Sequence, residues 1–393
     1  MKQKILFCNS ACNNMQQEFC ENLISVLHTM PIEINLLNSD LDLHYKNYDL
    51  VIAFNKQGYN SFKKLNLDIP LLYVMPSKDF YDSMLFDSSI YVHLLIANTK
   101  EIVYSNSFVT QFPYFWGVKQ IVSINKERKF RRLLVDIGNT NVLMDLLPLL
   151  NIYVDYEIDI LTPNPYRLKD AVNAHIRIST ERKRERLIEK ADVLIAEGYA
   201  ALKGVMQQKP VFVLGEYGFG GLVEKDNVRE QYRTGFSGRL GGVKGEYLPL
   251  QMMDNEIKKV FDRQVDGQKE TADVLCECCQ ETTDKFSQLV SFFVNLSLCK
   301  EKVVLRKNHY MDYICNNDGC YWVVDKVYRK LLFEIDEKEK SIVDYFETPH
   351  QLSFVYEKMK DNMLHEEIEM SVNELLKYKL LDYCIYETTG TEF

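Results

Sequence analysis

Short apolar runs alternate with helix-compatible stretches from the first residue of this chain to about residue 260. Each run is brief and bounded by polar sequence, which is typical of strands that are buried on both faces. Strands that alternate with helices form βαβ units, in which helices cover a parallel sheet. The sequence therefore predicts an α/β fold with strands at 5–8, 32–37, 50–54, 71–74, 92–96, 133–137, 156–161, 174–178, 191–195 and 211–214.

A charged segment without apolar periodicity, residues 122–130, divides these runs into two series. We expect this segment to be a linker between an N-terminal Rossmann-like domain, 1–121, and a second one, 131–270. The chain has 393 residues, more than a single hydrophobic core usually organises, which also favours several domains. Ligands of such sheets bind at the carboxyl ends of the strands, which we expect to face a cleft between the two domains.

The pattern changes after a connecting segment with a helix, predicted over 271–300. Residues 311–315, 316–319 and 320–324 read as strand, turn and strand, because Asn, Asp and Gly tolerate the backbone of a tight turn. A third strand is expected at 330–335, and helices at 336–346, 349–360 and 366–380. Thr348 before Pro349 is typical of a helix start. The sequence thus predicts a small α+β winged-helix domain over 301–393.

Charge and cysteine content narrow the function classes. The formal net charge of −9 argues against a general nucleic-acid binder. The N-terminal apolar run is too short for a signal peptide and no stretch approaches a membrane span, so we expect a cytoplasmic protein with free thiols. Cys276, Cys278 and Cys279 lack a matching second pair, which favours a cysteine-rich linker over a metal site. The basic stretch 181–186 is interrupted by acids and reads as a solvated helix face.

The most specific segment is 191–223, which reads as strand, loop, helix, turn, strand and glycine-rich loop. Gly198 stands just before the helix, whose free N–H groups suit a phosphate or a carboxylate. Glycines at 218, 220 and 221 would let the backbone approach a ligand closely. Turn chemistry alone also explains glycines in loops, and this alternative stays open.

This segment resembles the donor-binding region of GT-B glycosyltransferases. Its Ala-Leu-Lys-Gly-Val-Met helix, 201–206, and the following Gln-Lys-Pro-Val, 208–211, match the family's pattern. The resemblance implies two Rossmann-like domains in the GT-B arrangement. It also implies that the second domain binds a nucleotide-sugar donor, that the first binds the acceptor, and that transfer takes place between them without a metal.

Two departures from that family stand out. Lys203 occupies the position where the family usually places a glutamate that accepts hydrogen bonds from the ribose, and we expect Glu197 to substitute for it. The stretch 136–150 has no basic residue, so a diphosphate would depend on amides near Gly138 or on Arg233, Arg239 or Lys244. No catalytic residue is assigned. The expected donor-binding residues are Gly138, Asn139, Glu197, Gly198, Tyr199, Lys203, Glu216, Tyr217, Gly218, Phe219, Gly220, Gly221, Arg233 and Arg239.

The C-terminal domain has a resemblance of its own. Residues 316–325, 331–342 and 373–381 are similar to PqqD-like RiPP recognition elements. That resemblance implies binding of a ribosomally made precursor peptide as an added strand, a mode in which unpaired backbone groups supply affinity. A generic winged helix that contacts protein or DNA stays open, although the acidic residues 366–369 disfavour DNA. The expected peptide-binding residues are Lys330, Leu331, Leu332, Phe333, Glu334, Ile335, Ile368, Val372 and Leu375.

The two resemblances together predict a glycosyltransferase-like protein that recruits a precursor peptide. The main alternative is a catalytically inactive scaffold that binds a peptide or a peptide-modifying enzyme, favoured by Lys203 and by the lack of basic residues in 136–150. An ordinary polysaccharide or lipid glycosyltransferase with an accessory domain is a third possibility. It predicts association with a membrane, for which the sequence offers no basic amphipathic helix.

Overall fold

The computed structural model describes most of the chain. The described residues are 3–8, 14–37, 48–65, 69–75, 92–97, 109–112, 131–162, 164–180, 183–245, 248–262, 266–296, 304–309, 311–316, 320–326, 329–378 and 380–384. The predicted linker, 122–130, lies outside them. The chain divides into two compact units: unit 1 contains Met1–Phe112 and Asp284–Phe393, and unit 2 contains Pro113–Thr283.

The N-terminal part of unit 1 is built on a six-stranded parallel sheet in the order β2-β1-β3-β4-β5-β6. Its strands are rich in large apolar residues, and every residue of β3 is buried, as expected for a strand covered on both faces. The elements are β1 (Gln3–Cys8), α1 (Asn14–His28), β2 (Ile32–Leu36), β3 (Leu50–Phe54), α2 (Asn55–Leu65), β4 (Leu71–Met75), β5 (Val92–Ala97) and β6 (Val109–Phe112).

Unit 2 contains a second six-stranded sheet, in the order β12-β11-β10-β7-β8-β9. Five strands are parallel and β12 is antiparallel to β11. In chain order this arrangement is 3-2-1-4-5-6, the order of the Rossmann fold. The strands are β7 (Arg132–Asp136), β8 (Glu157–Leu161), β9 (Ile176–Ser179), β10 (Val193–Ala196), β11 (Val211–Gly215) and β12 (Gly218–Leu222).

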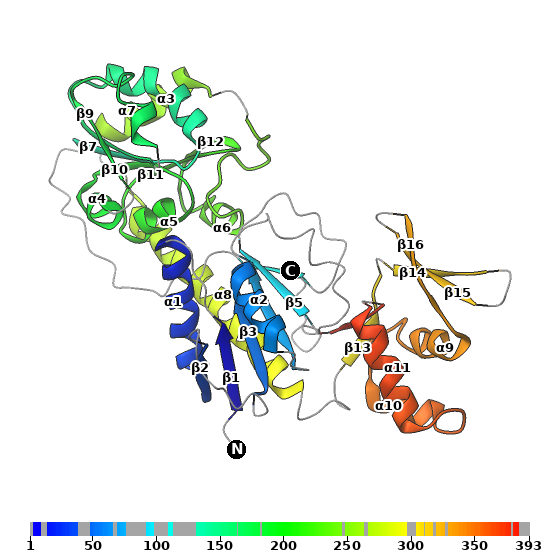
Figure 1. Ribbon diagram of the computed structural model, residues 1–393. Helices are drawn as coiled ribbons and strands as arrows, with labels where there is room; N and C mark the ends of the chain where they lie inside the picture. The colour runs from blue at the N-terminus through cyan, green and yellow to red at the C-terminus, as the bar shows by residue number, and fades with distance from the viewer. Residues whose placement is uncertain are drawn as a thin grey trace. The chain divides into compact units, whose positions relative to one another are not determined.

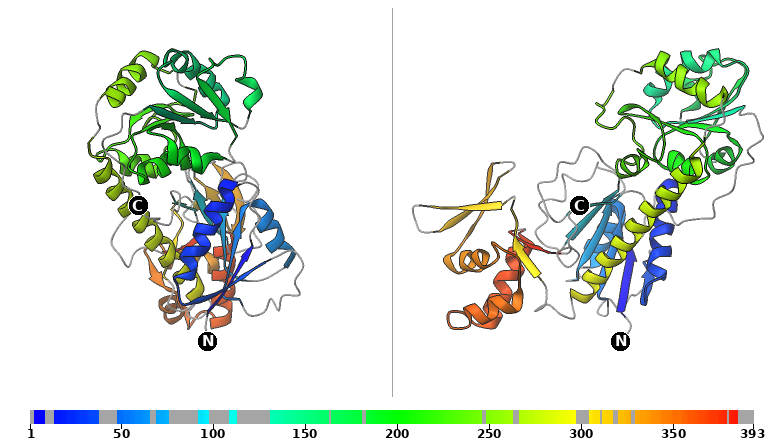
Figure 2. Two further views of the ribbon diagram at one scale, coloured as in Figure 1. Left: turned by 90° about the vertical axis from the view of Figure 1, so that its left-hand side faces the viewer. Right: turned by 180° about the vertical axis from the view of Figure 1, so that it is seen from behind.

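Helices cover both faces of the unit 2 sheet (Figures 1 and 2). Helices α3 (Thr140–Ile152) and α7 (Leu250–Asp262) lie on one face, and α4 (Arg184–Lys190) and α5 (Gly198–Met206) lie on the other. Alternate residues of β7 point to opposite cores: Leu133 and Val135 pack under α3, whereas Leu134 packs under α5. The predicted α/β class with two Rossmann-like domains is thereby confirmed.

One of the remaining elements of unit 2 differs from the sequence prediction. Residues 218–222, expected to be a loop, form β12, because β11 offers them an antiparallel partner. The unit also holds the 3-10 turn η3 (Pro165–Arg167) and α6 (Val228–Arg233), and α8 (Gln268–Leu296) passes from unit 2 into unit 1. The three clustered cysteines lie within α8 rather than in a linker, and Cys278 and Cys279 are buried in the core under α5.

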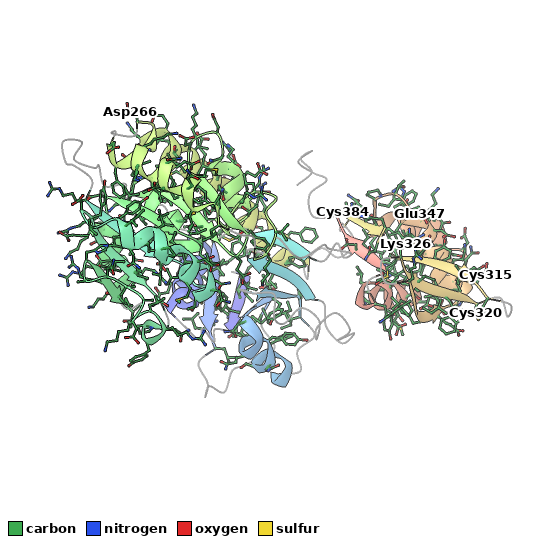
Figure 3. All side chains as sticks on the ribbon, turned by 90° about the horizontal axis from the view of Figure 1, so that it is seen from above. Asp266, Cys315, Cys320, Lys326, Glu347 and Cys384 are labelled. Atoms are coloured by element: carbon green, nitrogen blue, oxygen red, sulfur yellow. The ribbon has the colours of Figure 1, made fainter. Side chains whose placement is uncertain are left out.

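The C-terminal module, 304–384, contains two small antiparallel sheets. One has the order β14-β15-β16 and the other β17-β13-β18. Its elements are β13 (Val304–Lys307), β14 (Met311–Cys315), β15 (Tyr321–Asp325), β16 (Lys330–Ile335), α9 (Glu337–Tyr345), β17 (His350–Gln351), α10 (Leu352–Met359), α11 (His365–Lys377) and β18 (Leu381–Tyr383). Cys315 and Cys320 lie together at the tip of the β14–β15 hairpin (Figure 3).

Helix starts in this module differ in part from the expectation. Asp336 caps α9 by accepting a hydrogen bond from the Glu339 N–H, and the Glu339 carboxylate accepts one from the Asp336 N–H. Thr348, expected to cap the next helix, instead contacts the His350 ring at 3.1 Å, and α10 begins only at Leu352. The cause is β17, whose pairing with β13 holds 350–351 in an extended conformation.

Within the described part of the chain, no helix combines the length and the apolar character that a membrane crossing requires.

Candidate functional site

The strand order of unit 2 reverses between β7 and β10. The chain leaves β7 into α3 on one face of the sheet and leaves β10 into α5 on the other face. Residues that follow these two strands therefore meet at the carboxyl edge, the position at which ligands of open α/β sheets bind. We call this region, formed by Asp136, Gly138, Arg184, Glu197 and Gly198, the switch-point site.

Glu197 follows β10 and lies at the centre of the switch-point site. Its Oε1 accepts a hydrogen bond of 2.6 Å from the Gly138 N–H, which belongs to the turn after β7. Its Oε2 occupies the space next to Gly215, where an added Cβ would be only 2.5 Å from this oxygen. The carboxylate can therefore take this position only because residue 215 is a glycine.

The pKa of the Glu197 carboxyl group is raised toward neutral pH. Burial, together with the nearby charges of Asp136 and Glu216, raises the pKa of Glu197 to about 7, although hydrogen bonds from the N–H groups of Gly138 and Asn139 favour the ionised form. A carboxyl group with such a pKa exchanges its proton near physiological pH. Among described residues no group of three or more metal-ligating side chains occurs, here or elsewhere.

A basic residue reaches the site from α4. Arg184 holds Asp136, the last residue of β7, through two contacts, Nε to Oδ2 at 2.6 Å and Nη2 to Oδ1 at 3.2 Å. Both side chains are largely buried, with 15% and 7% of their surfaces exposed. Sequence reasoning missed Arg184, because it is distant along the chain and stood within a stretch expected to be solvated.

Gly198, the first residue of α5, has a φ of +56° and no neighbouring atom within 4 Å of an added Cβ. The space above it is therefore open, while its own N–H donates to the Phe236 carbonyl at 3.1 Å. The Glu197 side chain does not cap α5, since it turns toward Gly138. The structure thus brings the predicted donor residues 138, 139, 197 and 198 to one edge.

Tyr199 and Lys203 are held by α4 instead of facing open space. Glu185 accepts a hydrogen bond of 2.6 Å from the Tyr199 hydroxyl and lies 3.5 Å from the Lys203 ammonium. Lys203 also lies over the Tyr199 ring, with its Nζ 5.0 Å from the ring centroid. These contacts give both residues a role in packing α5 on α4.

The glycine-rich segments 215–221 and 235–245 pack against each other, backbone on backbone. A Cβ at Gly220 would be 2.7 Å from the Gly238 carbonyl oxygen, and one at Gly242 would be 2.2 Å from that of Tyr217. Tyr217 also forms an isolated bridge with Gly238. Close contact between chain segments therefore accounts for Gly220 without a ligand.

Other predicted donor residues lie in varied surroundings. Phe219 is 4% exposed and stacks on Phe212, so its side chain belongs to the core, which corrects its expected contact with a ligand. Glu216 pairs with Lys244 at 3.0 Å. Gly218, where the hairpin from β11 enters β12, has a φ of +83°, and Gly221, beside the register shift between the two strands, has a φ of +78°.

Arg233 and Arg239, the expected partners of a diphosphate, are exposed. Arg233 ends α6 close to Cys278 of α8; burial raises the pKa of that thiol, and the charges of Arg229 and Arg233 lower it. The basic residue that the structure brings to the switch-point site is Arg184.

Lys209, in the segment that resembles the GT-B pattern, has a structural role that the sequence did not reveal. It is 8% exposed, and its ammonium donates to the carbonyls of Ile188, Glu189 and Ala191 at 2.5–2.7 Å. These carbonyls form the end of α4, where a cation complements the helix dipole. Lys209 therefore fixes α4, and with it Arg184.

In the C-terminal module, the expected peptide-binding residues fall into two groups. On β16, the outer strand of its sheet, Lys330, Leu331 and Glu334 are exposed, Leu332 and Phe333 are half-buried, and Ile335 is buried. On α11, Ile368, Val372 and Leu375 are each 1% exposed. They form the interior of the module, so the helical spacing marked the core face, and their expected part in supporting a bound peptide stays a prediction.

No protein-family model matches the chain, and no curated protein matches it. Solved structures that include glycosyltransferases and a sugar-nucleotide epimerase are similar to it. MurG from Acinetobacter baumannii is 11% identical over 72% of this chain and 98% of its own, with a TM-score of 0.36. SnogD from Streptomyces nogalater is 11% identical over 75% and 100%, with a TM-score of 0.39.

UDP-GlcNAc 2-epimerase from Neisseria meningitidis, a structure bound to UDP-GlcNAc, is 10% identical over 72% of this chain and 100% of its own, with a TM-score of 0.36. Scores this low do not transfer an activity.

Proposed function

We propose that this protein is a glycosyltransferase-like protein whose switch-point site in unit 2 binds the nucleotide of a nucleotide-sugar donor. The observation that carries the proposal is the meeting of Gly138, Glu197 and Gly198 at the carboxyl ends of β7 and β10, where the strand order reverses. The GT-B-like motif, 191–223, supplies two of these residues and thus points to the same place.

The parts of this site suit a nucleotide in different ways. Gly198 leaves open space at the start of α5, so that a sugar or a phosphate can approach the backbone. Glu197 accepts from the N–H groups of Gly138 and Asn139 and keeps further lone pairs for ribose hydroxyls. Transfer would depend on orienting the donor against the acceptor and on stabilising the departing diphosphate.

The acceptor in this proposal is a ribosomally made precursor peptide, bound by the C-terminal module. The outer strand β16 supports this part, because the exposed Leu331 and the half-buried Phe333 stand on a sheet edge where a peptide strand can add. A modifying enzyme that carries the peptide is a further candidate partner.

One observation favours the scaffold alternative, in which the site binds without catalysing. Two backbone N–H groups of this site are engaged within the chain and not free for a diphosphate: that of Gly138 donates to Glu197, and that of Gly198 donates to the Phe236 carbonyl. Arg184, the basic residue at the site, is engaged with Asp136. On this alternative a nucleotide gains few new contacts and binds weakly.

Calorimetric titration of the purified protein with UDP, dTDP, GDP and ADP tests the proposal. We expect one of these nucleotides to bind, and binding to be lost in Gly198→Leu, whose side chain fills the open space. Gly267→Leu is the matched control, since Gly267 also has a positive φ, of +95°, but stands before α8. Binding that is equal in both variants, or no binding of any nucleotide, contradicts the proposed donor site.

A further inference from the structure

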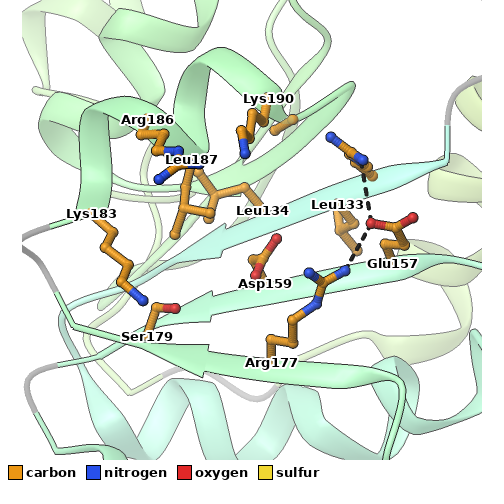
Figure 4. A pocket seen from close by; sticks show the side chains of 12 residues that line it. Leu133, Leu134, Glu157, Asp159, Arg177, Ser179, Lys183, Arg186, Leu187 and Lys190 are labelled. Atoms are coloured by element: carbon orange, nitrogen blue, oxygen red, sulfur yellow. Dashed lines mark hydrogen bonds and ion pairs between the residues drawn. The ribbon is translucent and has the colours of Figure 1, made fainter.

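A second recess of unit 2 lies apart from the switch-point site. It is a pocket of about 220 Å³ between α4 and the strands β7, β8 and β9 (Figure 4). Side chains of α4 and of the turn before it point down toward the sheet, and those of β8 and β9 point up toward them. We call this recess the basic pocket, because five of its lining residues are cationic: Arg132, Arg177, Lys183, Arg186 and Lys190.

The strands make this pocket polar by simple alternation. Ile158, Ile160 and Ile176 point into the core under α3. Their neighbours Asp159 and Arg177 therefore point to the opposite face, which α4 borders with only seven residues. A short crossover helix thus leaves polar side chains of β8 and β9 uncovered.

The charges of the basic pocket are mostly unmatched. Arg132 and Arg177 share one carboxylate, that of Glu157, at 3.3 and 2.8 Å. In the described part of the chain, Lys183, Arg186 and Lys190 form no ion pair. Asp159, at the middle of the pocket, is likewise more than 4 Å from their charged nitrogens. Five cations therefore face two carboxylates, in a protein whose net charge is −9.

Part of the stretch expected to be a solvated helix face thus lines a pocket. Unpaired cations that point into one recess repel one another, and this costs free energy unless an anion enters. Arginine and lysine side chains together offer the donors that bind phosphate oxygens. At about 220 Å³ the recess is smaller than the pockets that enclose whole drug-sized ligands, which start at roughly 300 Å³.

We propose that the basic pocket is a second anion site of unit 2, which binds a phosphate group. Lys183, Arg186 and Lys190 contact the phosphate from the α4 side, and Arg177 contacts it from β9. Asp159 opposes the phosphate and sets an upper bound on the affinity. The phosphate is either free or carried by a small molecule, and the chemistry of the pocket is the same for both.

The test is calorimetric titration with inorganic phosphate and, separately, with glycerol 3-phosphate, at low ionic strength. The protein carries Gly198→Leu, so that the proposed donor site does not contribute. We expect binding that weakens roughly tenfold or more in Lys183→Ala/Arg186→Ala/Lys190→Ala. Tighter binding of glycerol 3-phosphate indicates a carried phosphate, and equal or weaker binding indicates free phosphate.

Two further variants keep the result interpretable. Lys225→Ala/Lys259→Ala/Lys269→Ala removes the same charge from exposed positions outside the pocket and should bind as the parent does. Asp159→Asn removes the opposing carboxylate and should bind several-fold more tightly, a gain that misfolding cannot imitate. Absence of binding, equal weakening in both triple variants, or weaker binding in Asp159→Asn overturns the proposal.

Discussion

The switch-point site and the basic pocket lie in the same unit and share α4, yet they treat charge in opposite ways. At the switch-point site each charged group described above has a partner: Arg184 holds Asp136, and Glu197 accepts from Gly138. In the basic pocket three cations stand without one among the described residues. Within one short helix, Arg184 forms a buried ion pair, whereas Arg186, two residues later, forms no ion pair with a described residue.

This difference distinguishes two kinds of charged side chain: those that stabilise the fold by pairing with each other, and those that remain available to bind a ligand. A buried pair is expensive to break, because the remaining charge is left without compensation, while an exposed charge contributes little to stability. Charges of the first kind should therefore affect unfolding, and charges of the second kind should affect ligand binding. The predictions below test that division, from the largest expected effect to the smallest.

Arg184→Ala should lower the free energy of unfolding by about 3 kcal/mol, since it breaks a largely buried ion pair by removing the guanidinium that holds the Asp136 carboxylate. Arg186→Ala, on the same helix, should change it by less than about 0.5 kcal/mol. Urea unfolding of both variants, followed by circular dichroism, measures the difference. Equal effects of the two changes would remove the distinction between the two regions.

Lys209→Met should cost about 2 kcal/mol, because three carbonyls at the end of α4 lose their donor. Lys190→Met changes an exposed lysine of α4 itself and should be close to neutral. Thermal melting of both proteins provides the measurement. If Lys209→Met melts like the parent, the carbonyls of α4 are satisfied in another way and Lys209 does not fix the helix.

Glu197→Gln should change how stability depends on pH. A carboxyl group whose pKa is raised to about 7 binds its proton more tightly in the folded than in the unfolded protein, so the parent loses stability as pH rises from 4.5 to 7. The glutamine variant lacks this loss, and the two slopes should differ by at most about 1.4 kcal/mol per pH unit. Urea unfolding at pH 5, 6 and 7 tests this, and parallel slopes would contradict it.

The smallest effect concerns repulsion within the basic pocket. Arg186→Ala/Lys190→Ala should raise the free energy of unfolding by a few tenths of a kcal/mol at low salt, with no gain at high salt, where screening removes the repulsion. Denaturation at two salt concentrations without phosphate shows this. A loss of stability at low salt would mean that these cations have acidic partners.

The sequence predicted the strands of unit 2 well, because short β-rich apolar runs such as β11 carry their own signal. It missed β12, since Gly218–Leu222 has few β-forming residues and depends on pairing with β11. Strands β6, β13, β17 and β18 were missed for a similar reason: each has two to four residues and is defined by its partner.

The candidate site was predictable only in part. Gly138, Glu197 and Gly198 follow apolar strands, so their place at the carboxyl edge follows from the fold class. The pairing of Asp136 with Arg184 spans 48 positions in the chain and left no local signal. On α11, helical spacing correctly marked an apolar face but could not tell a core face from a face that binds a peptide.

The seven residues of α4 connect two chemically different places. Its first residue, Arg184, holds the end of β7 at the switch-point site, and Arg186 and Lys190 border the basic pocket. Lys209 holds its far end against the carbonyls it contacts. A displacement of α4 would therefore move residues of both the switch-point site and the basic pocket. If a ligand at one place changes affinity at the other, linkage requires the reverse effect to be equal in size.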